Sequence, residues 1–311
     1  MAVHALGDNF TAFFGRLNPG GSFVSTASSE HTSIRALIEN PSGSAGRLSP
    51  QCFLQGSYRQ ETAIYSINDV DIVALCQLWF PASGSNIRYW TRDQIFATIA
   101  APLLEHGTYR DKVIYGPGSM CIKLDLGIKV EILPVVYSDT NSDAAVEPFH
   151  LFRPEHGQWE PGYARYHQAH LTNKNGVPRT AGNFKPMIKV LKHLRTRYSL
   201  DAVSFHLECL LNVVPDQLFV GGPAWYIPNV LSYIAQYDAT AWSRAAIRTP
   251  CGERYLFSPS EWNDANWSSF HSFVCGWQNL ANVAAAQLTT SAAIAQWQRL
   301  LGDEFFPVSP S

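Results

Sequence analysis

Two different hydrophobic periods divide the chain. Up to about residue 150, short apolar runs are separated by turn residues, as expected for strands. From about residue 183, apolar residues recur every three to four positions, as expected for helices. We therefore predict an α+β protein with two lobes, namely a first lobe with a mixed sheet (residues 1–150) and a mostly helical second lobe (residues 151–311).

The individual elements follow from the same patterns. Predicted strands are "CFLQ", "DVDIVAL", "KVIY", "MCIKLDL" and "IKVEILPVVY". Predicted helices of the second lobe cover residues 184–199, 201–214, 225–237, 266–288 and 291–301, the last ending at Gly302. Residues 9–40 are expected to be helical, and so is "TRDQIFATIAAPLLEH", with a capping box from Thr91 to Gln94 and a kink or break at Pro102. Residues 138–180 are expected to be rich in loops, with "YSDTNSDAAVEP" as a linker, and the final "FFPVSPS" to be frayed.

Two acidic residues share one face of a predicted strand. Residues two apart in a strand point to the same side, so Asp69 and Asp71 project together while Val70 and Ile72 project to the opposite face. Two carboxylates so close repel each other unless a cation or water lies between them, and such a pair suits Mg²⁺ bound together with substrate phosphates. An arbitrary Asp-x-Asp is more often a solvent-exposed pair, so the assignment needs a second signal.

That signal comes from the residues around the pair. Gly56 and Ser57 follow the preceding strand, where a glycine lets backbone amides approach a phosphate and a serine adds a hydroxyl donor. A two-metal site usually takes a third carboxylate from a neighbouring strand, and Glu131 lies in the apolar strand "IKVEILPVV". Asp125 is the competing acid, but it lies beside a hairpin turn, where an exposed acid needs no special reason. A phosphate loop followed by a metal-binding strand predicts nucleotidyl transfer.

Composition removes several other classes of function. The 311 residues are 46% hydrophobic with a net charge of −2, so a long nucleic acid is not an expected partner. The six cysteines form no C-x-x-C pair, and "HQAH" at 167–170 has no cysteine pair nearby, so we predict reduced thiols and no zinc site. There is no pattern of a signal peptide or a membrane span, which predicts a cytoplasmic protein.

These motifs resemble a known group of enzymes. "GS" followed by Asp-x-Asp and a later "VEILP" resembles the polymerase-β-like nucleotidyltransferase superfamily. Within it, "LQGSYRQETAI", "NDVDIV", "IKVLKHLR", "VSFHLECL" and "AIAQWQRLLGDEFFP" are similar to bacterial cGAS/DncV-like nucleotidyltransferases, which make cyclic oligonucleotide messengers for anti-phage signalling. The resemblance covers about residues 30–307. It departs at Glu131, where the family more often has aspartate, and in the absence of the zinc insert of the animal enzyme.

The resemblance implies a bilobed polymerase-β-like fold whose second lobe closes over a nucleotide cleft, and it implies roles for particular residues. The residues implied to hold the phosphates of the donor nucleotide are Gln55, Gly56 and Ser57. The catalytic residues, implied to bind two Mg²⁺ or Mn²⁺ ions, are Asp69, Asp71 and Glu131. Lys192 and Ser204 are implied to contact the triphosphate, with Lys189 in reserve. By spacing alone, Lys185, Lys189 and Lys192 form a stripe that is by default a solvated helix face, and Arg59 is a surface charge or a phosphate contact.

The leading hypothesis is a synthase that joins ribonucleoside triphosphates (ATP, GTP or pyrimidine nucleotides) into a cyclic di- or trinucleotide, which a separate effector protein binds. A second hypothesis is a terminal nucleotidyltransferase acting on RNA or a small acceptor. A third is an inactive relative that serves as a nucleotide-binding module, although the three acids and the Gly-Ser pair are all present.

Overall fold

The computed structural model describes residues 6–80, 90–138, 148–237, 244, 246–252, 254–258 and 261–308. The contacts between residues divide the chain into two compact units. Each unit is built from segments that are not consecutive in the sequence. The sheet unit contains residues 20–60 and 67–168, and the helical unit contains residues 1–19, 61–66 and 169–311. A single boundary at residue 150 therefore does not describe how the chain is divided.

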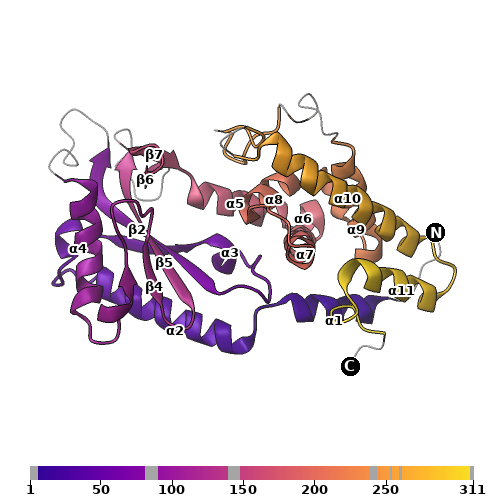
Figure 1. Ribbon diagram of the computed structural model, residues 1–311, viewed down its shortest axis with the longest axis horizontal. Helices are drawn as coiled ribbons and strands as arrows, with labels where there is room; N and C mark the ends of the chain where they lie inside the picture. Colours follow the sequence, from indigo (N-terminus) through magenta and orange to yellow (C-terminus); the bar gives the residue numbers. More distant parts are fainter. Residues whose placement is uncertain are drawn as a thin grey trace. The chain divides into compact units, whose positions relative to one another are not determined.

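A mixed sheet of seven described strands forms the sheet unit (Figure 1). The strands are β1 (Gln51–Gln55), β2 (Asp69–Phe80), β3 (Val113–Ile114), β4 (Ile122–Asp125), β5 (Lys129–Ser138), β6 (Phe149–Arg153) and β7 (Gln158–Gly162). Their order is β1-β2-β5-β4-β3, with β6 paired to β5 and β7 paired to β6. The pair β2–β5 is parallel and the other pairs are antiparallel, which makes the sheet mixed as predicted.

Helices α2 (Gly21–Ile38) and α4 (Arg92–Glu105) cover one face of this sheet (Figure 1). Their apolar residues form one core with the buried residues of β2 and β5, including Val70, Ile72 and Ile132. Because strand residues alternate between faces, this packing directs Asp69 and Asp71 to the opposite face. A short helix, α3 (Gly56–Arg59), follows β1 directly.

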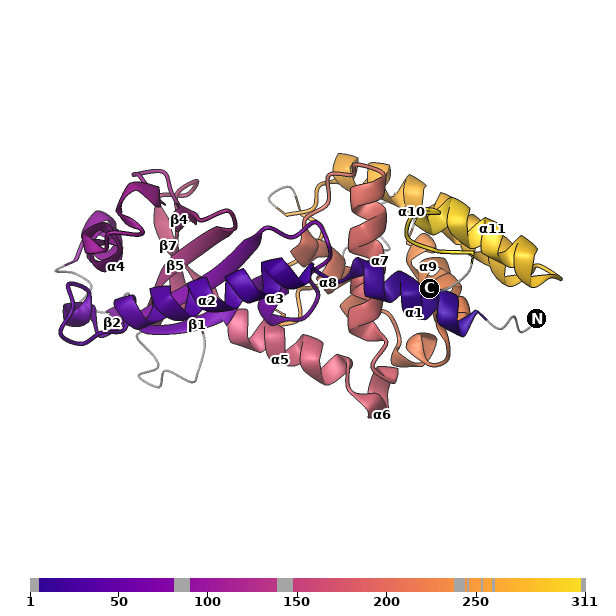
Figure 2. The same ribbon diagram turned by 90° about the horizontal axis from the view of Figure 1, so that it is seen from below.

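The helical unit has a second core. Its helices are α1 (Gly7–Leu17), α6 (Val177–Thr180), α7 (Phe184–Arg197), α8 (Ser204–Asn212), α9 (Pro223–Ala235), α10 (Asp264–Ala285) and α11 (Thr290–Leu301). Helix α5 (Ala164–Lys174) begins in the sheet unit and ends in the helical unit. Helix α1 packs against α7 (Figure 2), and four tryptophans, Trp262, Trp267, Trp277 and Trp297, are among the largest buried side chains.

Several predicted details are confirmed. Thr91 and Gln94 form the capping box of α4, and α11 is capped by Gly302 with a φ of 89°. Five predicted strands and the five predicted helices of the second lobe are present. Among the described residues, the structure has no helix that is both long and apolar enough to cross a membrane.

Other details are wrong. Residues 9–40 form two helices rather than one, because the chain leaves the helical conformation at Asn18 and α2 begins only after Gly20. Helix α4 continues through Pro102 to Glu105, so an interruption at Pro102 is excluded. Residues 149–174 form β6, β7 and α5 instead of loops, while the predicted linker lies mainly in 139–147, outside the described residues. The predicted frayed end begins with Phe305, and its second residue, Phe306, is fully buried.

Candidate active site

Strand register brings the predicted catalytic acids together. Asp71 of β2 is paired with Glu131 of β5 on one side and with Gln55 of β1 on the other. Neighbouring strands lie about 4.8 Å apart, so these three side chains form a row across the sheet. Asp69 lies two residues before Asp71, on the same face and next to Lys129. The sequence motif thus becomes one acidic patch on the sheet face opposite α2 and α4.

The first residue of α3 closes one side of this patch. Gly56 has a φ of +71°, a left-handed conformation that side chains with a Cβ adopt at a cost. A Cβ built on Gly56 would lie 1.8 Å from Oδ2 of Asp71. Glycine is therefore required here both by its backbone conformation and by the close approach of a carboxylate. The Gly-Ser pair predicted as a turn is the start of a one-turn helix, with Ser57 as its second residue.

Asp71 has a raised proton affinity within this patch. Burial, followed by the negative charges of Asp69 and Glu131, raises the pKa of Asp71 to about 7. Burial first, and repulsion second, disfavour the ionised form of Asp71. A cation bound at this patch would favour the ionised form.

Glu131 has partners that sequence reasoning missed. Its Oε1 lies 2.8 Å from Nζ of Lys123, and its Oε2 accepts a hydrogen bond of 3.5 Å from Sγ of Cys121. Lys123 is the register partner of Glu131 on β4, and the β4–β5 hairpin was predicted, so this pairing was the available signal. Burial and the charge of Glu131 raise the pKa of Cys121 to about 12, so the thiol stays protonated and donates.

The residues fit Mg²⁺ by their chemistry. Hard oxygen ligands from adjacent strands are what Mg²⁺ prefers, and its charge would relieve the repulsion on Asp71. In the part of the chain that the structure describes, no three His, Cys, Asp or Glu side chains are arranged to hold a metal ion as they stand. The carboxylate of Glu131 is instead paired with Lys123. A metal bound by all three acids would therefore share the carboxylate of Glu131 with Lys123.

The competing acid Asp125, one histidine of "HQAH" and Arg59 lie on three different elements. Asp125 is exposed at the β4–β5 turn, where its Oδ1 accepts a hydrogen bond from the amide of Gly127. His167 lies on α5 and takes part in no three-residue metal group among the described residues. Arg59 is exposed at the end of α3.

The lysines and the serine predicted to contact the triphosphate lie in the helical unit, and two of them form hydrogen bonds or ion pairs with other residues of that unit. Lys192 is 2% exposed, and its Nζ lies 2.8 Å from Oε1 of Glu208 and 2.9 Å from Oγ1 of Thr62. The hydroxyl of Ser204, at the start of α8, accepts a hydrogen bond from Arg195. Lys192 therefore joins α7, α8 and residues 61–66 within one unit, and the expected solvated face is wrong at this position.

Lys189 is less enclosed than Lys192. Its Nζ donates to Oδ1 of Asn18 over 2.8 Å, and burial lowers its pKa. Of the two predicted lysines, Lys189 is the one whose ammonium has no carboxylate partner in the described contacts.

Comparison with known proteins agrees with this geometry. The family model described as the Second Messenger Oligonucleotide or Dinucleotide Synthetase domain matches residues 4–175. The model of the cGAS/DncV-like nucleotidyltransferase C-terminal helical domain matches residues 169–280. The Cyclic UMP-AMP synthase of Rhodothermus marinus is 24% identical over 78% of this chain and 88% of its own. The Cyclic dipyrimidine nucleotide synthase CdnE of Legionella pneumophila is 25% identical over 70% of this chain and 80% of its own.

A solved structure shows the same fold. The CdnE c-UMP-AMP synthase of Rhodothermus marinus superposes with a TM-score of 0.67 at 21% identity, covering 89% of this chain and 97% of the other. The mixed sheet and the helical unit have the polymerase-β-like nucleotidyltransferase fold. Within that class, the chain belongs to the bacterial cGAS/DncV-like nucleotidyltransferases, as the resemblance predicted.

Proposed function

We propose that this protein joins ribonucleoside triphosphates into a cyclic di- or trinucleotide. The observation that carries the proposal is the row of Asp71 and Glu131 in register on β2 and β5, with Asp69 on the same face and Gly56 against Asp71. Membership of a family whose model is named for oligonucleotide and dinucleotide synthetases supports this chemistry over other nucleotidyl transfers.

Residues of the sheet unit supply the reaction. Asp69, Asp71 and Glu131 would hold Mg²⁺, which neutralises phosphate charge and makes a ribose hydroxyl a better nucleophile. The amide groups at Gly56 and the hydroxyl of Ser57 would hold the triphosphate in position, with Gln55 beside them. The hydroxyl oxygen forms a bond to the α-phosphorus in line with the departing oxygen, and pyrophosphate leaves. A second transfer closes a dinucleotide ring and a third closes a trinucleotide ring, and each releases one pyrophosphate.

Residues of the helical unit remain proposed contacts of the triphosphate. Lys192 would first have to exchange Glu208 for a phosphate, since a buried ammonium is unfavourable without an anionic partner. Ser204 would have to share its hydroxyl with Arg195.

The substrates we propose include a pyrimidine nucleotide. The relatives from Rhodothermus marinus and Legionella pneumophila are named for products that contain uridine or pyrimidine nucleotides. We further propose that the product acts in the cytoplasm as a second messenger in anti-phage defence, where it binds a separate effector protein.

The test is direct. The purified protein is incubated with ATP, GTP, CTP and UTP, each α-labelled in turn, and with Mg²⁺ or Mn²⁺, then treated with phosphatase. We expect a phosphatase-resistant product whose mass is that of a cyclic oligonucleotide and which carries label from a pyrimidine nucleotide. The variant Asp69→Asn/Asp71→Asn should make no product and keep its thermal unfolding transition. Asp125→Asn, which removes one exposed acid from β4, should be as active as the wild type.

Other outcomes would identify a different function. Extension of added RNA without any cyclic product would identify a terminal nucleotidyltransferase. Product formation by Asp69→Asn/Asp71→Asn at the wild-type rate would show that the acidic row is not the active site.

A further inference from the structure

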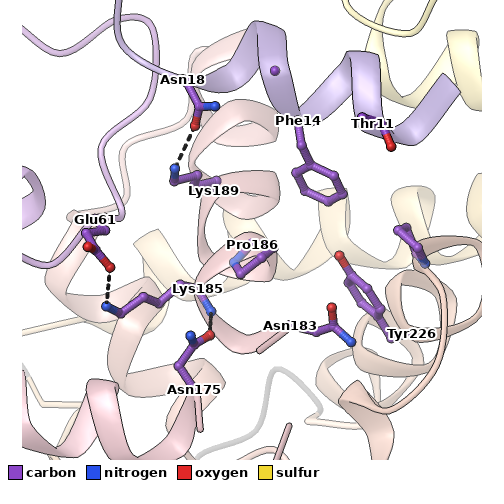
Figure 3. Close-up of a pocket in the computed structure, with 12 residues that line it drawn as sticks. Thr11, Phe14, Asn18, Glu61, Asn175, Asn183, Lys185, Pro186, Lys189 and Tyr226 are labelled. Carbon is purple, nitrogen blue, oxygen red and sulfur yellow. Dashed lines mark hydrogen bonds and ion pairs between the residues drawn. The ribbon is translucent and has the colours of Figure 1, made fainter. Parts of the chain in front are cut away.

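The helical unit contains a pocket formed where α1, α7 and α9 meet (Figure 3). Its volume is about 670 Å³, within the range of about 300–1,000 Å³ that is usual for small-molecule sites. All of the lining residues belong to the helical unit. They are Thr11, Phe14, Gly15, Asn18, Glu61, Asn175, Asn183, Lys185, Pro186, Lys189, Pro223 and Tyr226.

One wall of the pocket is positively charged. Lys185 and Lys189 lie one helical turn apart on α7, and Glu61 is the only acid among the lining residues. Nζ of Lys185 lies 2.9 Å from Oε2 of Glu61, whose side chain is 75% exposed. An exposed ion pair of this kind contributes only about 0–1 kcal/mol, so a bound anion can replace it.

Lys189 would gain more from a bound anion than Lys185 would. Burial lowers its pKa, and the positive charges of Lys192 and Lys185 lower it further, while Glu61 opposes them. Its ammonium donates a hydrogen bond to the neutral amide oxygen of Asn18. A negatively charged group between Lys185 and Lys189 would therefore compensate both ammonium groups.

The floor of the pocket is aromatic and contains an unused polar group. Tyr226 is fully buried, and its hydroxyl has no hydrogen-bond partner among the described residues. Figure 3 shows this hydroxyl directed towards the space between Phe14 and Pro186. Buried polar groups are rarely left unpaired, because each costs about 1–3 kcal/mol, so this hydroxyl is a second, independent sign of a ligand.

We propose that this pocket binds a small phosphate-bearing molecule with a flat ring, of the size of a mononucleotide. The phosphate would lie between Lys185 and Lys189, and the ring would pack against Phe14 with an acceptor atom reaching the hydroxyl of Tyr226. Asparagine amides at positions 18 and 175 would be available to hydroxyl and ring substituents. This inference does not rest on the proposed function, because no residue of the acidic row takes part, and it assigns Lys189 to this pocket in place of its reserve role at the triphosphate.

The test measures binding rather than turnover. Isothermal titration calorimetry is carried out in EDTA with AMP, GMP, CMP and UMP as probes and inorganic phosphate as the ring-free control. We expect at least one mononucleotide to bind the wild type and Asp69→Asn/Asp71→Asn equally, with a Kd below about 1 mM, and to bind more tightly than phosphate.

Single variants locate the binding. Lys189→Gln should weaken binding by about tenfold or more, since it removes a charged hydrogen bond. Arg299→Gln removes one positive charge from the exposed surface of α11 and should leave binding unchanged. Tyr226→Phe keeps the buried ring and should weaken binding by about fivefold, as expected for loss of one neutral hydrogen bond.

Three results would overturn the proposal. The first is no saturable binding of any of the four mononucleotides. The second is binding that requires Mg²⁺ and disappears in Asp69→Asn/Asp71→Asn, which would place the ligand at the acidic row. The third is equal binding by Tyr226→Phe, Lys189→Gln and the wild type.

Discussion

Replacing Gly56 by alanine tests the geometry of the acidic row. The Cβ that Gly56→Ala adds would lie 1.8 Å from Oδ2 and 2.9 Å from Cγ of Asp71, whereas ordinary contact begins at 3.4 Å. The nearest atom belongs to a side chain, so Asp71 can rotate away and the backbone can keep its course. We therefore expect the fold to survive and the carboxylate to be displaced by about 1.6 Å, the shortfall in that contact.

The size of the effect follows from that displacement. A misplacement of about 1 Å at a reacting centre costs about a hundredfold in rate, so kcat should fall by about a hundredfold or more, equivalent to about 2.7 kcal/mol. The left-handed conformation at φ +71° adds a separate cost of about 1–2 kcal/mol to the stability of the fold.

Gly127→Ala is the matched control. Gly127 has a φ of +83°, and a Cβ there meets no atom within 4 Å. Both variants should therefore lose about 1–2 kcal/mol in chemical denaturation, while only Gly56→Ala should lose turnover of labelled nucleotides. Equal kcat values for the two variants, or a much larger loss of stability in Gly56→Ala, would refute the reasoning.

Three further predictions follow from the contacts around the two cores. Between pH about 4 and about 7 in EDTA, Asp71 keeps a proton in the folded protein that it has lost in the unfolded chain, so Tm should fall as the pH rises through this range. The fall in Tm should be smaller in Asp71→Asn. Added Mg²⁺ should raise Tm most near pH 7. Lys192→Met should cost about 3–5 kcal/mol in urea unfolding because it removes the ammonium that neutralises the buried carboxylate of Glu208, and adding Glu208→Leu should recover most of it. Thr91→Ala should cost about 1 kcal/mol with no change in turnover, since it removes only the cap of α4.

Local patterns predicted the parts of the fold that depend on local physics. The cap at Thr91 and the end of α11 at Gly302 are set by residues a few positions apart, and both are confirmed. Strands β6 and β7 were missed because neither alternates between buried and exposed positions, although each pairs with the strand before it in the sequence. Val135 of β5 pairs with Leu151 of β6, and no period within "FHLFRPEHGQWEPG" reveals that partner.

The acidic row was predictable for a similar reason, and its surroundings were not. Alternation along β2 was enough to place Asp69 and Asp71 on one face. The ion pair of Glu131 with Lys123 depends on the register between β4 and β5, which a hairpin suggests but does not specify. Burial of Lys192 depends on residues 61–66 joining the helical unit, and a helical stripe alone cannot show that.

The helical unit combines residues 1–19 with residues 169–311, and this has a consequence for folding during translation. Phe10 packs edge-on against Trp297 and Phe306, at centroid distances of 5.0 Å and 4.9 Å, and Asn9 donates a hydrogen bond to the carbonyl of Pro307. Helix α1 leaves the ribosome long before residues 297–307, so the part of its apolar face that they cover must wait for their synthesis. Residues 20–60 and 67–168 meet no such delay, so during translation the sheet can form while the helical unit is still incomplete.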